Sequence, residues 1–210
     1  MARGLDIGDQ HDVRVIAIIR GCPPQHLPKI AEAAVSAGIG VLEVTFDSEE
    51  PEKGITRLRE TLPGVAVGAG TVLSEDQVAA ASDAGAEFLV SPVTDPHVLG
   101  AARQRGLFII PGAATPTEIR EAVALGADAV KVFPADALGG PDYLRAILAS
   151  LGPVPLVPTG GVNPENGADY LQAGAAAVGV GSSLFPSDAL ETGDVARIAA
   201  LGEALMRAIA

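Results

Sequence analysis

The chain of 210 residues lacks tryptophan, and only 3 % of its residues are aromatic. It has a single cysteine, Cys22, which excludes an intrachain disulfide framework. No stretch approaches the roughly 18 uncharged apolar residues of a membrane-spanning helix. The N-terminal residues also lack an apolar signal core, which predicts a cytoplasmic protein.

Positive charge is scarce as well. Lysine and arginine total 14 against 26 aspartates and glutamates, giving a net charge of −12. This balance argues against nucleic acid or an anionic membrane as a partner. An anionic small molecule would therefore have to be bound by local groups, because the field of the whole protein repels it.

Metal ligands and reactive thiols are equally sparse. The histidines His11, His26 and His97 are scattered, and no pair has the spacing of metal ligands. We therefore expect no metal and no cofactor. Cys22 has no histidine positioned near it in the sequence, so we expect a packing thiol and not a nucleophile.

What the chain does have is an alternation of short apolar runs and helical stretches. The runs predict strands at Val13–Ile19, Gly40–Phe46, Val65–Gly70, Ala86–Val90, Leu107–Ile110, Ala127–Phe133, Val154–Pro158 and Ala175–Gly181. The stretches with apolar residues at three- and four-residue spacing predict helices at Pro24–Ala37, Pro51–Leu62, Ser74–Ala84, Asp95–Arg105, Thr115–Leu125, Pro141–Leu151, Asn163–Ala173 and Asp188–Ile209.

Capping residues and glycines mark the ends of these helices. Ser74, Thr115 and Asn163 are predicted to begin helices, because each is a good capping residue followed by acidic residues or proline. Glycine follows seven of the helical stretches, as expected at a helix C-terminus: Gly38, Gly64, Gly85, Gly106, Gly126, Gly152 and Gly174.

Eight repeats of strand, helix and glycine predict a (β/α)8 barrel, that is, a TIM barrel of the α/β class. A doubly wound open sheet is the alternative, but it usually has fewer strands and often a glycine-rich first turn. No segment resembles a linker, so residues 1–210 are predicted to form one domain. Residues 1–12 are expected to be a short N-terminal helix or arm that covers the bottom of the barrel.

One lysine stands out because of its surroundings. Lys131 lies in the middle of the apolar run Ala127–Phe133, whereas Lys29 and Lys53 fall in polar, helix-like segments. Burial lowers the pKa of an amine, and a neutral amine is a nucleophile toward ketones. Alternatively, the lysine could reach the wet end of its strand or pair with a buried carboxylate.

A carboxylate occupies the corresponding place in a second strand. Glu43 lies inside the apolar run Val41–Thr45, where desolvation raises its pKa and suits it to accept and return a proton. It could instead be a structural partner of Arg20 or Lys131. Two opposite charges buried at strand ends are costly, so the pair points to function.

Glycines and hydroxyl residues follow the last two strands. The segments Thr159-Gly160-Gly161 and Gly181-Ser182-Ser183 stand where barrels commonly bind phosphate on backbone N–H groups. Glycine also serves ordinary turns, so either segment alone is weak support. Their adjacent positions predict a phosphate site.

Arg20 ends the first predicted strand. Its planar guanidinium could grip a carboxylate or phosphate, or it could form a salt bridge with Glu43 or Asp47. Asp47 and Ser48 could bind substrate hydroxyls or simply open the loop before Pro51.

Taken together, the strand-end motifs resemble the bacterial 2-keto-3-deoxy-6-phosphogluconate (KDPG) and 4-hydroxy-2-oxoglutarate (KHG) aldolase family. The resemblance runs from about Val13 to Ser183, and its motifs occur in the family's order. They are Leu42-Glu43-Val44-Thr45, Gly68-Ala69-Gly70-Thr71-Val72, Phe88-Leu89-Val90-Ser91-Pro92, Ile110-Pro111-Gly112, Lys131-Val132-Phe133-Pro134-Ala135 and Pro158-Thr159-Gly160-Gly161-Val162.

The resemblance implies a metal-free class I aldolase on a (β/α)8 barrel, usually a homotrimer. By resemblance, Lys131 would form a Schiff base with the C2 ketone, and Glu43 would act as the acid and base. Thr71 would hold the pyruvyl carboxylate, and Pro92 and Phe133 would wall the pocket. The segments Thr159–Gly161 and Gly181–Ser183 would bind the 6-phosphate. The products would be pyruvate and glyceraldehyde 3-phosphate, or pyruvate and glyoxylate from 4-hydroxy-2-oxoglutarate.

One position departs from the gluconate-type pattern. Those enzymes have an arginine four residues after the catalytic glutamate, whereas this chain has Asp47. The segments Ile18-Ile19-Arg20-Gly21 and Phe46-Asp47-Ser48 are more similar to the galactonate branch, 2-dehydro-3-deoxy-6-phosphogalactonate aldolase. Our hypothesis is that Arg20 replaces the missing arginine.

Three alternatives therefore stay open at the level of sequence. The first is an aldolase specific for the galactonate epimer. The second is a phosphate-binding barrel isomerase or epimerase, which would need no imine-forming lysine. The third is a non-catalytic sugar-phosphate-binding barrel, which would leave the buried pair of Glu43 and Lys131 unexplained.

Overall fold

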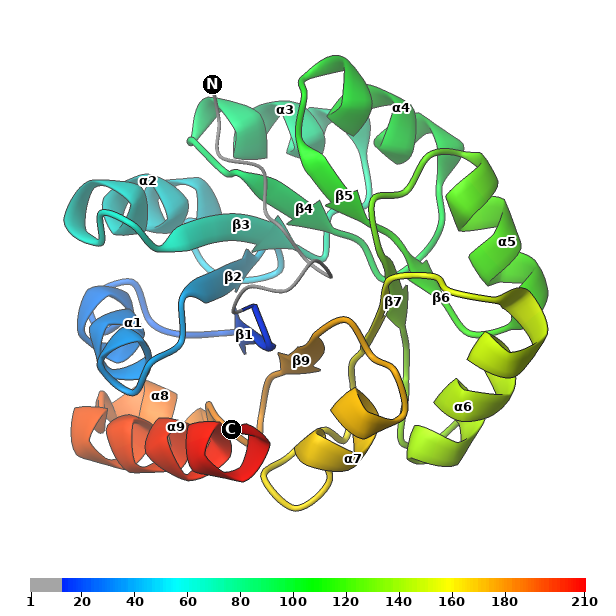
Figure 1. The fold of residues 1–210 in the computed structure, drawn as a ribbon. Coiled ribbons are helices and arrows are strands. Elements are labelled where there is room, and N and C mark those ends of the chain that lie inside the picture. Colours follow the sequence, from blue (N-terminus) through cyan, green and yellow to red (C-terminus); the bar gives the residue numbers. More distant parts are fainter. Residues whose placement is uncertain (1–12) are drawn as a thin grey trace.

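The computed structural model describes residues 13–210, in which helices surround a curved parallel sheet (Figure 1). The strands are β1 (Val15–Ile19), β2 (Val41–Thr45), β3 (Ala66–Gly70), β4 (Phe88–Val90), β5 (Phe108–Ile110), β6 (Gly112–Ala113), β7 (Val130–Val132), β8 (Leu156–Pro158) and β9 (Val178–Val180). The helices are α1 (Leu27–Ser36), α2 (Pro51–Thr61), α3 (Glu75–Asp83), α4 (Pro96–Gln104), α5 (Pro116–Ala124), α6 (Gly140–Leu151), α7 (Gly167–Gln172), α8 (Ser187–Thr192) and α9 (Val195–Ile209). The arm expected over residues 1–12 lies outside the described residues.

The strands close into a ring in two parts. Six strands pair in the order β5-β4-β3-β2-β1-β9, and three pair in the order β6-β7-β8. The parts are continuous through β5 and β6, which are one barrel strand interrupted at Pro111, a residue without a backbone N–H. On the other side, a single bridge between Thr159 and Gly179 joins β8 to β9. This arrangement confirms the (β/α)8 barrel.

The predicted helix ends are largely confirmed. All seven glycines expected after helices have a positive φ, the backbone region that glycine adopts without steric cost. Ser74 caps α3 by accepting a hydrogen bond from the Gln77 N–H. Thr115 caps α5 in a reciprocal capping box with Glu118, whose carboxylate accepts from the Ala114 and Thr115 N–H groups. These two hydrogen bonds lower the pKa of Glu118.

Two predictions about helices were wrong. The stretch Asp188–Ile209 is two helices and not one, because the chain turns at Gly193, with a φ of +67°, and Asp194 caps α9. Asn163 does not begin α7: its side chain accepts from the Glu165 and Asn166 N–H groups in a turn that precedes the helix. A local hydrogen-bonded turn competes with helix at asparagine, which the apolar spacing alone does not reveal.

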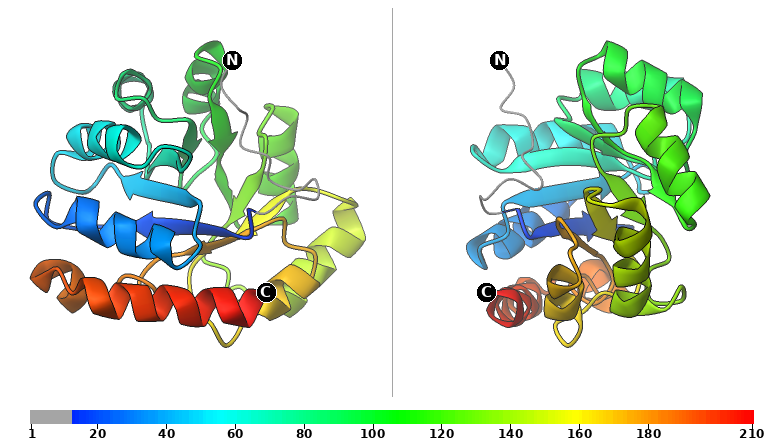
Figure 2. Two further views of the ribbon diagram at one scale, coloured as in Figure 1. Left: turned by 60° about the vertical axis from the view of Figure 1, so that its left-hand side comes forward. Right: turned by 45° about the vertical axis from the view of Figure 1, so that its right-hand side comes forward.

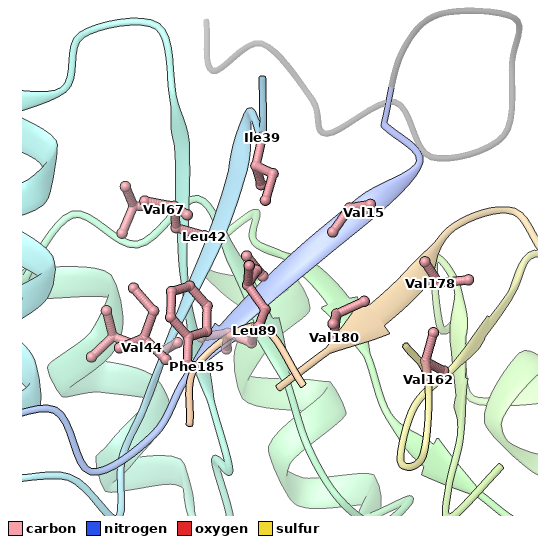
Figure 3. Packing of buried hydrophobic residues seen from close by; sticks show 14 of the residues in the cluster. Val15, Ile39, Leu42, Val44, Val67, Leu89, Val162, Val178, Val180 and Phe185 are labelled. Atoms are coloured by element: carbon pink, nitrogen blue, oxygen red, sulfur yellow. The ribbon is translucent and has the colours of Figure 1, made fainter. Parts of the chain in front are cut away.

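Alternation along the strands divides the core into two layers. Residues such as Val15, Leu42 and Val67 point outward and pack against the helices (Figure 3). Their neighbours in sequence point inward and form a second cluster of buried side chains: Ile16, Val41, Phe88, Val90, Ile110, Ala129, Val157 and Ala177. The interior of the barrel is therefore a packed floor, and not a pore.

The C-terminal helix, α9, belongs to the outer layer of the barrel. Helix α9 lies alongside α1, so the last helix covers the barrel beside the first (Figure 2). Across the part of the chain that the structure describes, no helix is both long and apolar enough to cross a bilayer.

The capping box yields a stability prediction. Thr115→Ala removes an exposed side chain whose main interaction is the cap of α5. We expect the free energy of unfolding to fall by about 1 kcal/mol in urea titrations. The control is Thr61→Ala, because the hydroxyl of the exposed Thr61 only bonds the Arg57 carbonyl of its own helix, and it should change stability by less than about 0.5 kcal/mol. Equal effects for the two variants would contradict the role of the cap.

Candidate functional site

The same alternation brings the two predicted catalytic side chains into the interior. Glu43, on β2, comes two residues after Val41, and Lys131, on β7, comes two residues after Ala129, which directly precedes the strand. Each therefore stands one layer above the apolar floor. Both border one small void in the barrel, together with Ile16, Ile18, Val90, Ile110, Val157, Thr159 and Gly179. Residues that are 88 positions apart in the chain therefore face one chamber.

A cavity of about 620 Å³ opens above this chamber. All ten residues predicted to bind substrate line it: Arg20, Thr71, Pro92, Phe133, Thr159, Gly160, Gly161, Gly181, Ser182 and Ser183. Lys131 also lines the cavity, whereas Glu43 lies below it and borders only the deeper void. The lysine thus stands between the cavity and the carboxyl group.

Lys131 is almost fully enclosed, with 5 % of its surface exposed. Burial lowers its pKa from the ordinary value for lysine; the nearby Glu43 opposes this shift, and Arg20 adds to it. The ring of Phe133 lies over the amine, with its centroid 5.1 Å from Nζ. A larger share of the amine is therefore neutral, and so nucleophilic, than for a lysine in water.

Glu43 is buried, and its Oε1 has no hydrogen-bond partner within the described residues. Burial raises its pKa, while the charges of Lys131 and Arg20 lower it and Asp47 raises it further. A buried carboxyl oxygen without a partner is costly in a protein, so such atoms commonly bind water or a ligand. The shifts bring the pKa values of Glu43 and Lys131 closer together. This suits proton exchange between these groups and a third molecule.

Gly70 makes room for the carboxyl group. A Cβ placed on Gly70, at the end of β3, would lie 1.7 Å from Glu43 Oε1. Only a residue without a side chain fits beside Glu43 at this height of the barrel.

Of the two carboxylates predicted as salt-bridge partners of Arg20, the structure pairs it with Asp47 and not with Glu43. Its Nη1 donates to the Asp47 carboxylate, and its Nη2 donates to Thr71 Oγ1 at 3.0 Å. The structure thus gives Arg20 the salt bridge with Asp47 and a place on the cavity wall at the same time. Ser48, next to Asp47, accepts a hydrogen bond from the Gly21 N–H, which ties the loops after β1 and β2 together.

Thr71 adopts a backbone conformation that is rare for its type, with a φ of +58°. A β-branched residue in the left-handed region is strained, and such strain concentrates at functional sites. The conformation places the hydroxyl beside Arg20, where a glycine would offer no hydroxyl.

The glycine and serine loops present free donors to the cavity. The Gly161, Ser182 and Ser183 N–H groups donate no hydrogen bond to any residue within 13–210. Other polar groups of these loops are hydrogen-bonded within the protein. Gly181 O accepts from the Leu184 and Phe185 N–H groups, and Ser183 Oγ donates to Val162 O at 2.7 Å. Free N–H groups on two adjacent loops are the usual form of an anion site.

Some lining residues were missed at the level of sequence. Ile18, Val162, Asn163 and Gly179 border the cavity although none was predicted to do so. For Asn163 a signal existed, since it lies two residues after the Gly160-Gly161 pair, and its Nδ2 donates to Gly161 O. Gly179 is needed because a Cβ there would lie 2.3 Å from Thr159 Oγ1.

Residues predicted to be inert lie apart from this chemistry. Cys22 is buried in the outer core, and burial raises the pKa of its thiol to about 11. His97 lies on the surface beside Glu75. Within residues 13–210, no three histidine, cysteine, aspartate or glutamate side chains come together in a metal-ligand cluster.

A closed barrel with a buried lysine and carboxyl group, and a cavity at the ends of its strands, has the arrangement of a TIM-barrel enzyme. Comparison with known proteins narrows this class. The model of the "KDPG and KHG aldolase" family matches residues 9–201. This chain belongs to that family and is an aldolase.

Individual relatives agree with the family. The KHG/KDPG aldolase of Escherichia coli (strain K12) is 40 % identical over 177 residues, which span 84 % of this chain and 83 % of the relative. A native KDPGal structure superimposes with a TM-score of 0.89 at 33 % identity, covering 96 % of each chain. The KDPG aldolase from Legionella pneumophila, with pyruvate captured as a covalent carbinolamine intermediate, has a TM-score of 0.86 at 34 % identity and covers 92 % of this chain and 94 % of that one.

The space beside Glu43 yields a prediction. Gly70→Ala would drive a methyl group into the carboxyl group, so Glu43 must move. We expect kcat for aldol cleavage to fall by about 100-fold, the loss typical of a misplaced catalytic group. Gly100→Ala in α4 is the matched control, because nothing lies within 4 Å of its added methyl group. A Gly70→Ala enzyme with wild-type kcat would show that the position of Glu43 is unimportant.

Proposed function

We propose that this chain is a class I aldolase that cleaves a 2-keto-3-deoxy-6-phospho-sugar acid to pyruvate and glyceraldehyde 3-phosphate. The same site would cleave 4-hydroxy-2-oxoglutarate to pyruvate and glyoxylate. The observation that carries the proposal is the desolvated Lys131 amine, which lines the cavity and also borders the deeper void that Glu43 borders. The covalent pyruvate adduct captured in the Legionella relative supports the same chemistry.

The reaction begins with the lysine. The lone pair of Lys131 Nζ attacks the C2 ketone, and loss of water from the carbinolamine leaves a protonated imine. This imine accepts the electron pair of the breaking C3–C4 bond, which a neutral ketone does poorly. The aldehyde departs, and the enamine that remains on Lys131 becomes pyruvate after protonation at C3 and hydrolysis.

Glu43 would move the protons, acting through a bridging water. Its raised pKa suits both directions of transfer, since a carboxyl group gives and takes protons more readily as its pKa moves toward the working pH. It would protonate the hydroxyl that leaves the carbinolamine, accept the C4 hydroxyl proton during cleavage and return a proton to C3. The unpartnered Oε1 supports this role, because it is free to bind the water.

The cavity wall would orient the substrate from both ends. Arg20 and Thr71, which are hydrogen-bonded to each other, would hold the C1 carboxylate beside Lys131. The loops Thr159–Gly161 and Gly181–Ser183 would bind the 6-phosphate on their free N–H groups. Pro92 and Phe133 would cover the imine and keep water away from it.

A galactonate-type substrate is the second candidate, because one observation favours it. Arg20 stands on the cavity wall at the end of β1, as in the galactonate branch that the sequence resembles there, and the native KDPGal structure superimposes over 96 % of the chain. The two substrates differ only in the configuration of C4, so both fit the same imine chemistry.

Assembly, domain organisation and location stay predictions. We propose a homotrimer in which Leu73 and Val93, exposed by 51 % and 49 % on loops after neighbouring strands, are covered by second copies of the chain. A solution mass three times that of the chain, measured by light scattering, would support this. A single domain over residues 1–210 and a cytoplasmic location are proposed from the sequence.

The covalent step has a direct test. Borohydride reduction with pyruvate should add the mass of the reduced adduct to the peptide that carries Lys131, and Lys131→Met should abolish both adduct and turnover. Trapping should increase as pH rises through a pKa below the 10.5 of an ordinary lysine, because only the neutral amine attacks. Lys29→Met, on the exposed face of α1, is the control. Cleavage without an adduct would contradict the Schiff-base mechanism, and an adduct without cleavage would contradict the proposed substrate.

The choice of substrate is tested by cleavage assays. We expect both C4 epimers of the phosphorylated substrate to be cleaved, with kcat/KM higher for one of them, and 4-hydroxy-2-oxoglutarate to be cleaved more slowly because it lacks the phosphate. Cleavage of the gluconate epimer alone would remove the second candidate. Equal kcat/KM for 4-hydroxy-2-oxoglutarate would contradict the phosphate site.

A further inference from the structure

Arg20 pairs with a carboxylate, that of Asp47, which does not line the cavity. Asp47 accepts from Arg20 Nη1, while Arg20 Nη2 donates to Thr71 Oγ1 at 3.0 Å. Arg20 and Thr71 line the cavity and Asp47 does not. These three residues follow β1, β2 and β3, which are neighbours in the sheet, so the row Asp47–Arg20–Thr71 lies at the rim of the barrel.

The backbone around this row is tied down. Ser48 Oγ accepts from the Gly21 N–H at 2.9 Å and lies 3.0 Å from Oγ1 of the buried Thr45. The residues that follow Arg20 and Asp47 are thereby joined to each other and to β2. The backbone beside both Arg20 and Asp47 is therefore held in place.

The pair does little for folding stability. Its side chains are exposed by 52 % and 45 %, and ion pairs this exposed contribute little because water screens them. A guanidinium has five N–H donors in one plane, and the contacts to Asp47 and Thr71 leave others free. An arginine fixed in this way loses less conformational freedom when it binds a carboxylate than an unpaired arginine does.

We propose that Asp47 is a positioning residue of the aldolase reaction: it holds the Arg20 guanidinium against Thr71, facing the substrate carboxylate, and it offsets the positive charge of Arg20 near Glu43. The inference rests on the proposed function, and it assigns a role to the aspartate that stands where gluconate-type relatives have arginine. Asp47 acts through Arg20 and does not touch the substrate.

The charges around Glu43 give this role a distinct signature. The charged groups that act on the Glu43 carboxyl group are Lys131, Arg20 and Asp47; the first two lower its pKa and Asp47 raises it. Removing the Asp47 charge must therefore lower the pKa of Glu43, and removing the Arg20 charge must raise it. A residue that only stabilised the loop would move neither.

The experiment compares Asp47→Ala and Asp47→Asn with Asp83→Asn, which breaks an exposed ion pair with Arg105 between α3 and the end of α4. For each variant, we would measure the pyruvate concentration that half-saturates borohydride trapping, kcat and KM for cleavage, the pH profile of kcat and the thermal midpoint. Asp47→Ala should raise half-saturating pyruvate and KM by about tenfold, the loss expected for one charge-assisted contact, with a smaller change in kcat.

The pH profile should shift in opposite directions. In Asp47→Asn the limb of the profile set by Glu43 moves to lower pH, and in Arg20→Ala it moves to higher pH, whereas Asp83→Asn leaves it in place. Unchanged half-saturation and an unmoved limb in Asp47→Ala would overturn the inference, and so would a lower thermal midpoint without either change. If the wild-type enzyme itself formed no pyruvate adduct, the proposed function would fail, and that outcome is separate because it needs no variant.

Discussion

The removal of Lys131 and Glu43 from water is the constraint on which the rest of this site depends. Each would be charged in solution, and each loses hydration inside the barrel, so burial pushes the lysine pKa down and the glutamate pKa up. Keeping two such groups in a core costs stability that a pair of apolar residues would not. The fold tolerates this because the layer beneath them, the inner cluster that includes Ile16 and Ala177, is filled with apolar side chains.

Small residues beside these groups make that arrangement possible. A Cβ on Gly68 would lie 2.5 Å from the Phe88 ring, and one on Gly70 would lie 1.7 Å from Glu43, so β3 is thin where its neighbours are bulky. The interior is thus divided by height: a large aromatic ring fills the lower layer, and a carboxyl group fills the one above it. Glycine in a strand weakens the strand itself, but here the two glycines leave the space that the Phe88 ring and the Glu43 carboxyl group occupy.

Much of this could be predicted from the sequence, because the informative residues break a pattern. A charge within an apolar strand is conspicuous, so Glu43 and Lys131 were found, and barrel geometry then gathered the strand-end loops into one cavity. The continuation of the fifth strand beyond Pro111 was missed, since the apolar run ends at Ile110, and the turn at Gly193 was missed, since apolar spacing runs through it. The partner of Arg20 stayed open for a different reason. Glu43 and Asp47 were both within reach, and only side-chain geometry decides between two carboxylates.

The barrel is joined least firmly between β8 and β9. In the part of the chain that the structure describes, the Thr159–Gly179 bridge and a hydrogen bond from Ala176 N to Leu156 O connect these strands, whereas β2 and β3 pair along their whole length. The loops Thr159–Gly161 and Gly181–Ser183 stand on opposite sides of that seam, and Ser183 already reaches across it to Val162. An anion held by both loops would connect β8 and β9 where few hydrogen bonds join them. Occupancy of the cavity would therefore stabilise the barrel at the junction with the fewest backbone hydrogen bonds.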